Sequence, residues 1–157
     1  MTRDSSHIQF REGHAAVDLN QLKLLFDVTA FWAKKRDVQG LAVAIAHSNP
    51  VVSVWDRQRM IGFARATSDG IYRATIWDVV IDPEYQGAGL GRKLVETVLS
   101  HPLMNRVERV YLMTTHQQRF YERIGFQENS TTTMILYNQP EFNPIPVDAP
   151  MEASIES

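Results

Sequence analysis

Apolar residues recur with two different spacings along the N-terminal half of the chain. Residues 7–11 are expected to form a strand. Residues 19–32 place apolar side chains three and four positions apart, which predicts a helix capped by Asp18. Asp37 is expected to cap a second helix that runs to about His47, where a Ser-Asn-Pro sequence ends it.

Three strands are expected to follow. Residues 51–56 and 60–67 predict two antiparallel strands joined by a tight turn. Residues 74–82 are the strongest strand prediction, because they are rich in β-branched residues and nearly continuously apolar from Ile76 to Ile81. Such a run is typical of a strand that is buried on both faces at the centre of a sheet.

The C-terminal half begins with a glycine-rich turn. A helix is expected from this turn to about Ser100, with an apolar stripe of Leu90, Leu94, Val95, Val98 and Leu99. Residues 107–115 predict a strand and residues 116–123 a short helix ended by Gly125. Residues 126–129 and 131–138 are expected to form a hairpin. This order predicts a mixed α/β sheet with helices on both faces, in one domain over residues 1–137.

The composition is that of one soluble domain. The chain has 157 residues, of which 44% are hydrophobic and 22% charged. The absence of cysteine excludes disulfides, thiolate metal sites and a cysteine nucleophile. The longest apolar run, Leu41–Ala46, is far below the roughly 20 residues that cross a bilayer. Met1–Gln9 is polar and lacks the apolar run of a signal peptide. We therefore expect a cytoplasmic protein with no membrane contact.

Residues 138–157 differ from the rest of the chain. They contain four prolines and four acidic residues but no basic residue, which predicts an extended or disordered tail. Without the tail, the net charge changes from −2 to about +2, a mild excess that suits an anionic cofactor. No basic stripe of the kind that binds nucleic acid is present, so we expect no nucleic-acid partner.

The glycine turn Gln86-Gly87-Ala88-Gly89-Leu90-Gly91 is the first candidate for chemistry. Glycines between a strand and a helix expose backbone N–H groups at the positive helix terminus, which favours binding of a phosphate. The alternative is a tight turn that only needs positive φ. A P-loop is excluded because Lys and Ser or Thr do not follow the last glycine, and the dinucleotide-binding spacing does not match either. The five histidines show no metal-ligand spacing, so no metal site is expected.

Two segments resemble signatures of the GNAT superfamily of N-acetyltransferases. Residues 86–91 match its Gln/Arg-x-x-Gly-x-Gly/Ala signature, and residues 120–126 resemble its F-Y-x-x-x-G-F segment. Residues 61–69 and 74–91 resemble in particular the plastid and cyanobacterial branch, which includes plant serotonin N-acetyltransferases, some of them also reported as lysine acetyltransferases. The resemblance covers roughly residues 6–137. It implies a mostly antiparallel sheet of six to seven strands with a splayed central strand pair.

The resemblance also implies acetyl-CoA as the co-substrate. Backbone groups of the central strand would bind the pantetheine arm, with the Val79 amide near the thioester carbonyl, and the turn would hold the pyrophosphate. Thr114 stands where many members have an asparagine. The expected cofactor-binding residues are Val79, Val80, Ile81, Gln86, Gly87, Ala88, Gly89, Leu90, Gly91, Arg92, Thr114 and Tyr121.

Two residues are candidates for proton transfer. The resemblance implies that Tyr121 is the general acid; the alternative is a helix aromatic packed on the sheet. Asp78 is the candidate base, because a charge inside an apolar strand is costly unless it is paired or functional. Its alternative is a structural role at a strand bulge. Phe31, Trp32 and Trp77 are candidates for binding the acceptor, with core packing as the alternative.

The expected reaction is direct acetyl transfer to a primary amine, with an arylalkylamine such as serotonin as acceptor. A protein lysine or N-terminus is the alternative acceptor, and a non-catalytic acyl-CoA-binding module is the alternative function. The segment before the second signature departs from the plant members, which read F-A-D-S-K where this chain has Met113-Thr114-Thr115-His116. The protein is expected to be a monomer or homodimer.

Overall fold

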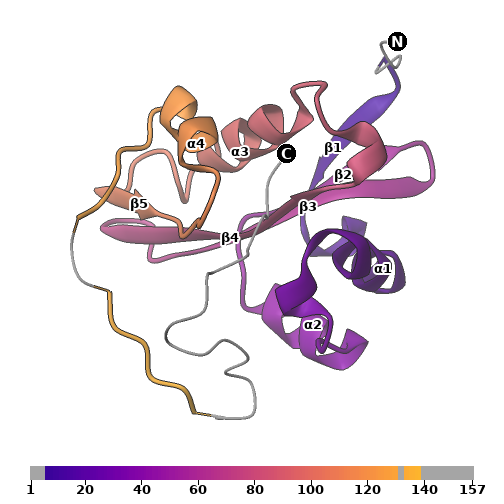
Figure 1. Ribbon diagram of the computed structural model, residues 1–157, viewed down its shortest axis with the longest axis horizontal. Helices are drawn as coiled ribbons and strands as arrows, with labels where there is room; N and C mark the ends of the chain where they lie inside the picture. The colour runs from indigo at the N-terminus through magenta and orange to yellow at the C-terminus, as the bar shows by residue number, and fades with distance from the viewer. Residues whose placement is uncertain (1–5, 131–132, 139–157) are drawn as a thin grey trace.

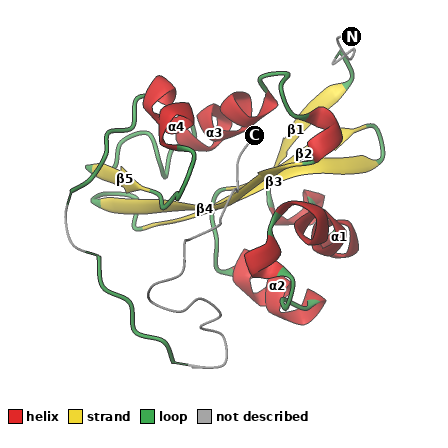
Figure 2. Cartoon of the chain, in the orientation of Figure 1, coloured by secondary structure: helices red, strands yellow, loops and turns green. Residues whose placement is uncertain are grey.

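A five-stranded sheet runs through the middle of the computed structural model, which describes residues 6–130 and 133–138 (Figures 1 and 2). The predicted tail therefore lies outside the described residues, apart from Asn138. The strands lie side by side in chain order: β1 (Ile8–Glu12), β2 (Val51–Asp56), β3 (Arg59–Ser68), β4 (Arg73–Ile81) and β5 (Arg109–Tyr111). The pairings from β1 to β4 are antiparallel, and β4 pairs with β5 in parallel.

Two pairs of helices cover the two faces of the sheet (Figure 1). Helices α1 (Leu19–Thr29) and α2 (Val38–Ala46) lie on one face. Helices α3 (Leu90–Leu99) and α4 (Gln118–Ile124) lie on the other. The predicted helix caps are confirmed, because the Asp18 carboxylate accepts from the Gln21 amide at 3.1 Å and Asp37 accepts from the Gly40 amide at 2.7 Å.

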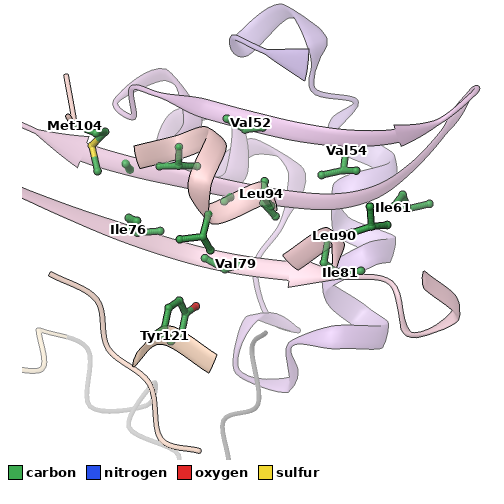
Figure 3. Close-up of a cluster of buried hydrophobic side chains, with 14 of the residues drawn as sticks. Val52, Val54, Ile61, Ile76, Val79, Ile81, Leu90, Leu94, Met104 and Tyr121 are labelled. Atoms are coloured by element: carbon green, nitrogen blue, oxygen red, sulfur yellow. The ribbon is translucent and has the colours of Figure 1, made fainter. Parts of the chain in front are cut away.

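The core consists of two apolar layers, one on each face of the sheet. On the α3 face, Leu94 and Val98 pack in a cluster with Ile76 and Val79 of β4. Figure 3 shows Leu94, Ile76 and Val79 of this cluster. On the α1 face, Leu22 and Phe26 pack in a cluster with Phe63 and Val80. Neighbouring residues of β4 thus enter opposite layers, as the period of a strand requires. Ile76, Val79, Val80 and Ile81 of the apolar run are buried, as its sequence predicts, whereas Trp77 and Asp78 are half-buried.

Several predicted element boundaries were wrong. The first helix ends at Thr29 and a 3-10 turn (Phe31–Ala33) follows it, and the strand expected over 107–115 is only three residues long. The described part of the predicted C-terminal hairpin is not formed, since residues 126–130 and 133–138 have no regular secondary structure, and residues 131–132 lie outside the described residues. The described sheet therefore has five strands instead of six to seven. β-propensity alone does not make a strand without a hydrogen-bonding partner, and here Met134 is 93% exposed.

The pairing of β4 with β5 is short. It comprises three residue pairs and ends at Thr75 and Tyr111. From Ile76 to Ile81, β4 pairs only with β3 among the described strands. The backbone of this part of β4 therefore keeps one edge without a strand partner in the described chain, next to the glycine turn that follows the strand.

Candidate active site

A bulge interrupts β4 at Asp78. Phe63 pairs with Val80 and Arg65 pairs with Trp77, so Asp78 and Val79 together oppose the single residue Ala64. Asp78 has a φ of 58°, in the left-handed region that aspartate tolerates better than most residues. Asp78, the predicted base, therefore lies at a strand bulge. The alternative interpretation of this residue, a structural role, assumed such a bulge.

The Asp78 carboxylate contacts two guanidinium groups. Its Oδ2 accepts from Arg65 Nε at 2.8 Å and from Arg36 Nη1 at 3.0 Å, and the side chain is only 7% exposed. Arg65 lies on β3, and Arg36 lies in the loop that precedes α2. Charge-assisted bonds of this kind stabilise the ionised carboxylate and join the loop to the bulge.

The sequence analysis missed both arginines. The sequence did contain one indication of them. A carboxylate inside an apolar strand is costly unless it is paired with a cation, so the position of Asp78 indicates a basic partner. This indication does not say which of the chain's arginines and lysines supplies the charge, because Arg36 lies 42 positions from Asp78 in the sequence.

Tyr121 lies on the α3 face of the sheet. It is 2% exposed and belongs to the same core cluster as Val79. Figure 3 shows its ring rising from α4 toward β4. Phe120 and Phe126 contact it edge-on, with ring centroids 4.9 and 5.7 Å away. The two candidate catalytic residues therefore belong to opposite sides of β4, since Arg36, which binds Asp78, also contacts Phe26 in the α1 layer.

The glycine turn is open on its outer side. Gly87 and Gly89 have φ values of 85° and 78°, and a Cβ at either position would meet no heavy atom within 4 Å. Gly89 is the N-cap residue of α3 and makes no side-chain cap bond, so the first amides of the helix are not covered by a capping side chain. Exposed amides at a helix N-terminus beside open space fit an anionic group.

The other predicted residues of the turn have different surroundings. Gln86 donates from Nε2 to the Ile81 carbonyl at 2.9 Å, which ties the turn back to the end of β4. Arg92 is exposed and pairs with Glu96 at 3.3 Å. Ala88 is exposed, whereas Leu90 and Gly91 are buried at the start of α3.

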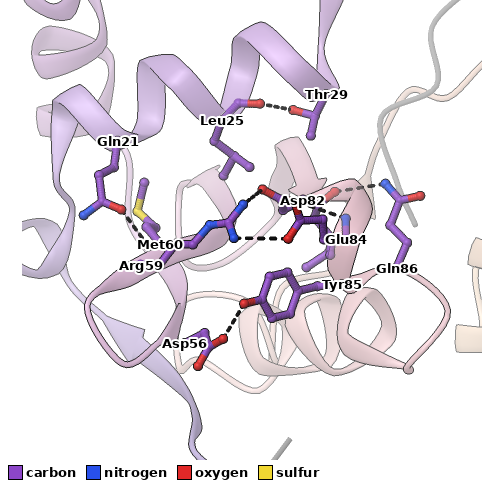
Figure 4. Close-up of polar contacts among 11 residues, drawn as sticks. Gln21, Leu25, Thr29, Asp56, Arg59, Met60, Asp82, Glu84, Tyr85 and Gln86 are labelled. Atoms are coloured by element: carbon purple, nitrogen blue, oxygen red, sulfur yellow. Dashed lines mark hydrogen bonds and ion pairs between the residues drawn. The ribbon is translucent and has the colours of Figure 1, made fainter. Parts of the chain in front are cut away.

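A polar cluster holds the start of the turn in place (Figure 4). Asp82 caps the 3-10 turn Pro83–Tyr85, as its predicted role as a turn former requires, and accepts from Arg59 Nη2 at 2.9 Å. Tyr85 donates from its hydroxyl to Asp56. Partial desolvation lowers the pKa of Arg59, but the hydrogen bond to Glu84 and the neighbouring carboxylates outweigh it and raise that pKa above its usual value. The hairpin of β2 and β3 thus anchors the turn.

Thr114 and Tyr121 line one hollow between β5 and α4. Its volume is about 1140 Å³, and Thr75, Tyr111 and Phe126 also line it. The Thr114 hydroxyl accepts from the Gln117 amide at 3.1 Å, just before α4. A hydrogen bond and the charge of Arg109 lower the pKa of the Tyr111 phenol. Residues 86–91 do not line this hollow, so it is separate from the turn.

The candidate acceptor residues lie on the side of Asp78. Trp77 donates from Nε1 to Thr67 Oγ1 at 3.0 Å, and the Arg65 guanidinium lies 5.9 Å from the centroid of its ring. Trp32 is partly buried against the α1 layer. The side chain of Phe31 lies outside what the structure describes.

The described residues contain no group of three or more His, Asp or Glu side chains placed to hold a metal ion. None of their helices combines the length and apolar character needed to span a bilayer.

A family model described as "Acetyltransferase (GNAT) domain" matches residues 39–128 of this chain. These residues include all but the first residue of α2, the bulged strand, the glycine turn and Tyr121. The chain belongs to the GNAT acetyltransferase family.

Relatives of this GNAT protein occur in plants. It is 36% identical over 123 residues to the soybean (Glycine max) protein named "Histone acetyltransferase TAP1", a match that covers 71% of this chain and 52% of the relative. It is 46% identical over 71 residues to "GCN5-related N-acetyltransferase 2, chloroplastic" from Arabidopsis thaliana, covering 45% of this chain and 28% of the relative. The resemblance to the plastid branch is therefore confirmed. The chain spans about half the length of the soybean relative.

A solved structure has the same fold. The crystal structure of a putative GNAT-family acetyltransferase from Xanthomonas campestris pv. campestris matches with a TM-score of 0.73 and 27% identity, covering 83% of this chain and 94% of the other. GNAT acetyltransferases use acetyl-CoA. The open space over Gly87 and Gly89 fits its pyrophosphate, because nothing there obstructs an anion from approaching the backbone.

Proposed function

We propose that this GNAT domain transfers an acetyl group from acetyl-CoA directly to a primary amine. The observation that carries the proposal is the left-handed glycine turn, open to solvent, at the N-terminus of α3, which directly follows the bulged strand. The amides of residues 87–91, with Arg92, would hold the pyrophosphate. The backbone of Val79, Val80 and Ile81 would bind the pantetheine arm along the edge that no described strand covers.

Two groups of the chain would assist the transfer, one at the carbonyl oxygen and one at the leaving sulfur. The Val79 amide would stabilise the negative charge that develops on the carbonyl oxygen. Tyr121 would donate toward the leaving sulfur. A phenol with a pKa of about 10 does not readily protonate the thiolate of a thiol with a pKa of about 8.5, because the transfer is uphill by about 2 kcal/mol. Tyr121 therefore acts chiefly as a strong hydrogen-bond donor. With no cysteine in the chain, an acyl-cysteine intermediate is excluded.

Asp78 as the base stays a prediction. An alkylamine with a pKa of about 10.4 is neutral in only about one molecule in 10³ at pH 7, so some group must accept its proton. The Asp78 Oδ2 already accepts hydrogen bonds from two guanidinium groups, which tie the loop before α2 and strand β3 to the bulge. This geometry favours the alternative role, in which Asp78 holds the bulge.

A small arylalkylamine such as serotonin is the first candidate acceptor, supported by Trp77 and Trp32 on the Asp78 side of the sheet. A lysine side chain is the second candidate, because the soybean relative is named a histone acetyltransferase. A cytoplasmic location, a monomeric or homodimeric state and the lack of a nucleic-acid partner stay predictions.

Release of CoA from acetyl-CoA tests this function. The purified chain is incubated with acetyl-CoA and a panel of arylalkylamines, polyamines and lysine peptides. We expect amine-dependent CoA release and an N-acetylated product identified by mass spectrometry. Acetyl-CoA binding without CoA release over the whole panel would instead support a non-catalytic acyl-CoA-binding module.

A further inference from the structure

Two guanidinium groups face a single carboxylate beside the bulge. Arg36 and Arg65 both bond Oδ2 of Asp78, and among the described residues neither arginine has a second ion-pair partner. The three side chains therefore carry one unmatched positive charge. A partly desolvated charge of this kind is stabilised by an anion that approaches it.

Arg36 has unused donors that solvent can reach. Its Nη1 donates to Asp78, whereas its Nε and Nη2 have no hydrogen-bond partner among the described residues, and the side chain is 37% exposed. Arg65 differs, since its Nε donates to Asp78, its Nη1 donates to the Ser48 hydroxyl at 3.2 Å, and it is only 18% exposed. A guanidinium with two free N–H groups in one plane matches the two oxygens of a carboxylate.

The loop around Arg36 reinforces the positive charge. Lys34 and Lys35 are exposed and have no ion pair among the described residues. The carboxylate of Asp37 caps α2 through the Gly40 amide. The Phe26 ring, 5.7 Å from the Arg36 guanidinium, carries no charge. The segment 34–37 therefore carries three cationic side chains and one carboxylate, and its net positive charge attracts anions.

We propose that Arg36 determines acceptor specificity by binding a carboxylate that the acceptor carries in addition to its reacting amine. This inference rests on the proposed function, because it assigns the acceptor to the same site. Within that function it favours an amine that carries a carboxylate over serotonin, which has none. Arg36 bonds the side chain of Asp78, the residue directly before Val79, so Arg36 is attached to the strand one residue from the amide that the proposed function places at the thioester carbonyl, on the α1 side of β4. The substrate class is a primary amine that also carries a carboxylate, either on the amine-bearing carbon, as in an aromatic α-amino acid, or on residues that flank a lysine.

Two matched acceptor pairs test the proposal. Tryptophan and tryptamine differ only in the carboxylate, and a peptide with Glu on both sides of one lysine is compared with the same peptide carrying Gln. We expect kcat/KM to favour the carboxylate member of at least one pair by about fivefold to twentyfold, as a charge-assisted, partly exposed contact allows. Arg36→Gln should lower that ratio about fivefold or more, and Arg36→Lys should give an intermediate value. The ratio is taken within each variant, so a general loss of activity cancels.

Lys35→Gln is the matched control, because it removes one charge from the same loop without touching Asp78, and it should keep nearly the wild-type ratio. A wild-type ratio of about one in both pairs, or an unchanged ratio in Arg36→Gln, would overturn the proposal.

Calorimetric titration of the same acceptors, with CoA present, separates this inference from the proposed function. If no acceptor is turned over, acetyl transfer to these amines fails. A carboxylate preference in binding that Arg36→Gln abolishes would still support the role of Arg36, and equal binding would reject it.

Discussion

At the scale of single residues, the Tyr121 ring packs in the core, and its hydroxyl is the predicted hydrogen-bond donor to the leaving sulfur. Its ring is held between Phe120 and Phe126, so Tyr121→Phe keeps these contacts and removes only the hydroxyl. We expect the rate to fall about 10²–10⁴-fold, the usual range for one positioned acid, while acetyl-CoA affinity changes little. Steady-state kinetics and acetyl-CoA titration measure the two quantities. An unchanged rate would leave Tyr121 with a packing role alone.

Asp78 can be tested for charge and backbone conformation separately. Asparagine also tolerates the left-handed region, so Asp78→Asn keeps the bulge but leaves Arg36 and Arg65 without their counter-charge. We expect a loss of about 2 kcal/mol or more in unfolding free energy and an activity loss that is uniform with pH. Thermal unfolding and pH–rate profiles measure these effects. An activity loss that shrinks toward high pH, where the amine is already neutral, would instead identify Asp78 as the base.

At the scale of elements, the turn before α3 is predicted to bind the cofactor through its backbone. Gly89→Asp places a carboxylate where the pyrophosphate would lie, so acetyl-CoA affinity should fall tenfold or more, equivalent to about 1.4 kcal/mol. Gly89→Asn is the matched control, since it is of similar size, tolerates the same φ and carries no charge. Equal affinities of the two variants, measured by titration, would contradict an anion site at this turn.

Helix α1 depends on its cap. The hydrogen bond from the Gln21 backbone amide lowers the pKa of Asp18. A carboxyl whose pKa is lower in the folded state stabilises the protein above its unfolded pKa, and this contribution disappears as the pH falls through the folded pKa. Asp18→Ala should therefore cost about 1 kcal/mol at neutral pH and progressively less in acid.

Asp18→Asn controls for the charge at this cap, because it keeps an acceptor at the N-cap without titrating. Urea unfolding of the three proteins at several pH values measures the difference. A cost of Asp18→Ala that does not change with pH would show that the carboxylate contributes no pH-dependent stability.

At the scale of the whole molecule, the two core layers share one sheet. Leu22 is fully buried in the α1 layer and Leu94 in the α3 layer. Each change to Ala should lower the free energy of unfolding by about 2–5 kcal/mol. The two losses should add within about 0.5 kcal/mol, because the residues lie on opposite faces without shared partners.

Because both layers pack on the same strands, we expect one unfolding transition by fluorescence and by circular dichroism. Two transitions would show that the layers unfold separately.

Local features of the fold and site followed from the sequence alone. The caps at Asp18 and Asp37, the apolar stripe of α3 and the positive φ of Gly87 and Gly89 depend on a few neighbouring residues. Periodicity, capping and turn geometry act over one or two turns of chain, so residue types and spacing determine them. The acetyltransferase family was recognised for the same reason, because its signatures are short and contiguous.

Only the tertiary structure decided which distant groups meet. The length of each strand depends on whether a neighbouring strand is present to pair with it. The apolar residues after Thr133 were predicted to form a strand, but in the structure they are exposed. The two partners of Asp78 come from 13 and 42 positions away, and the position of Tyr121 against β4 depends on how α4 packs on the sheet. Such contacts form between elements that are far apart in the chain. The sequence around one of these residues therefore does not indicate which distant residue it contacts.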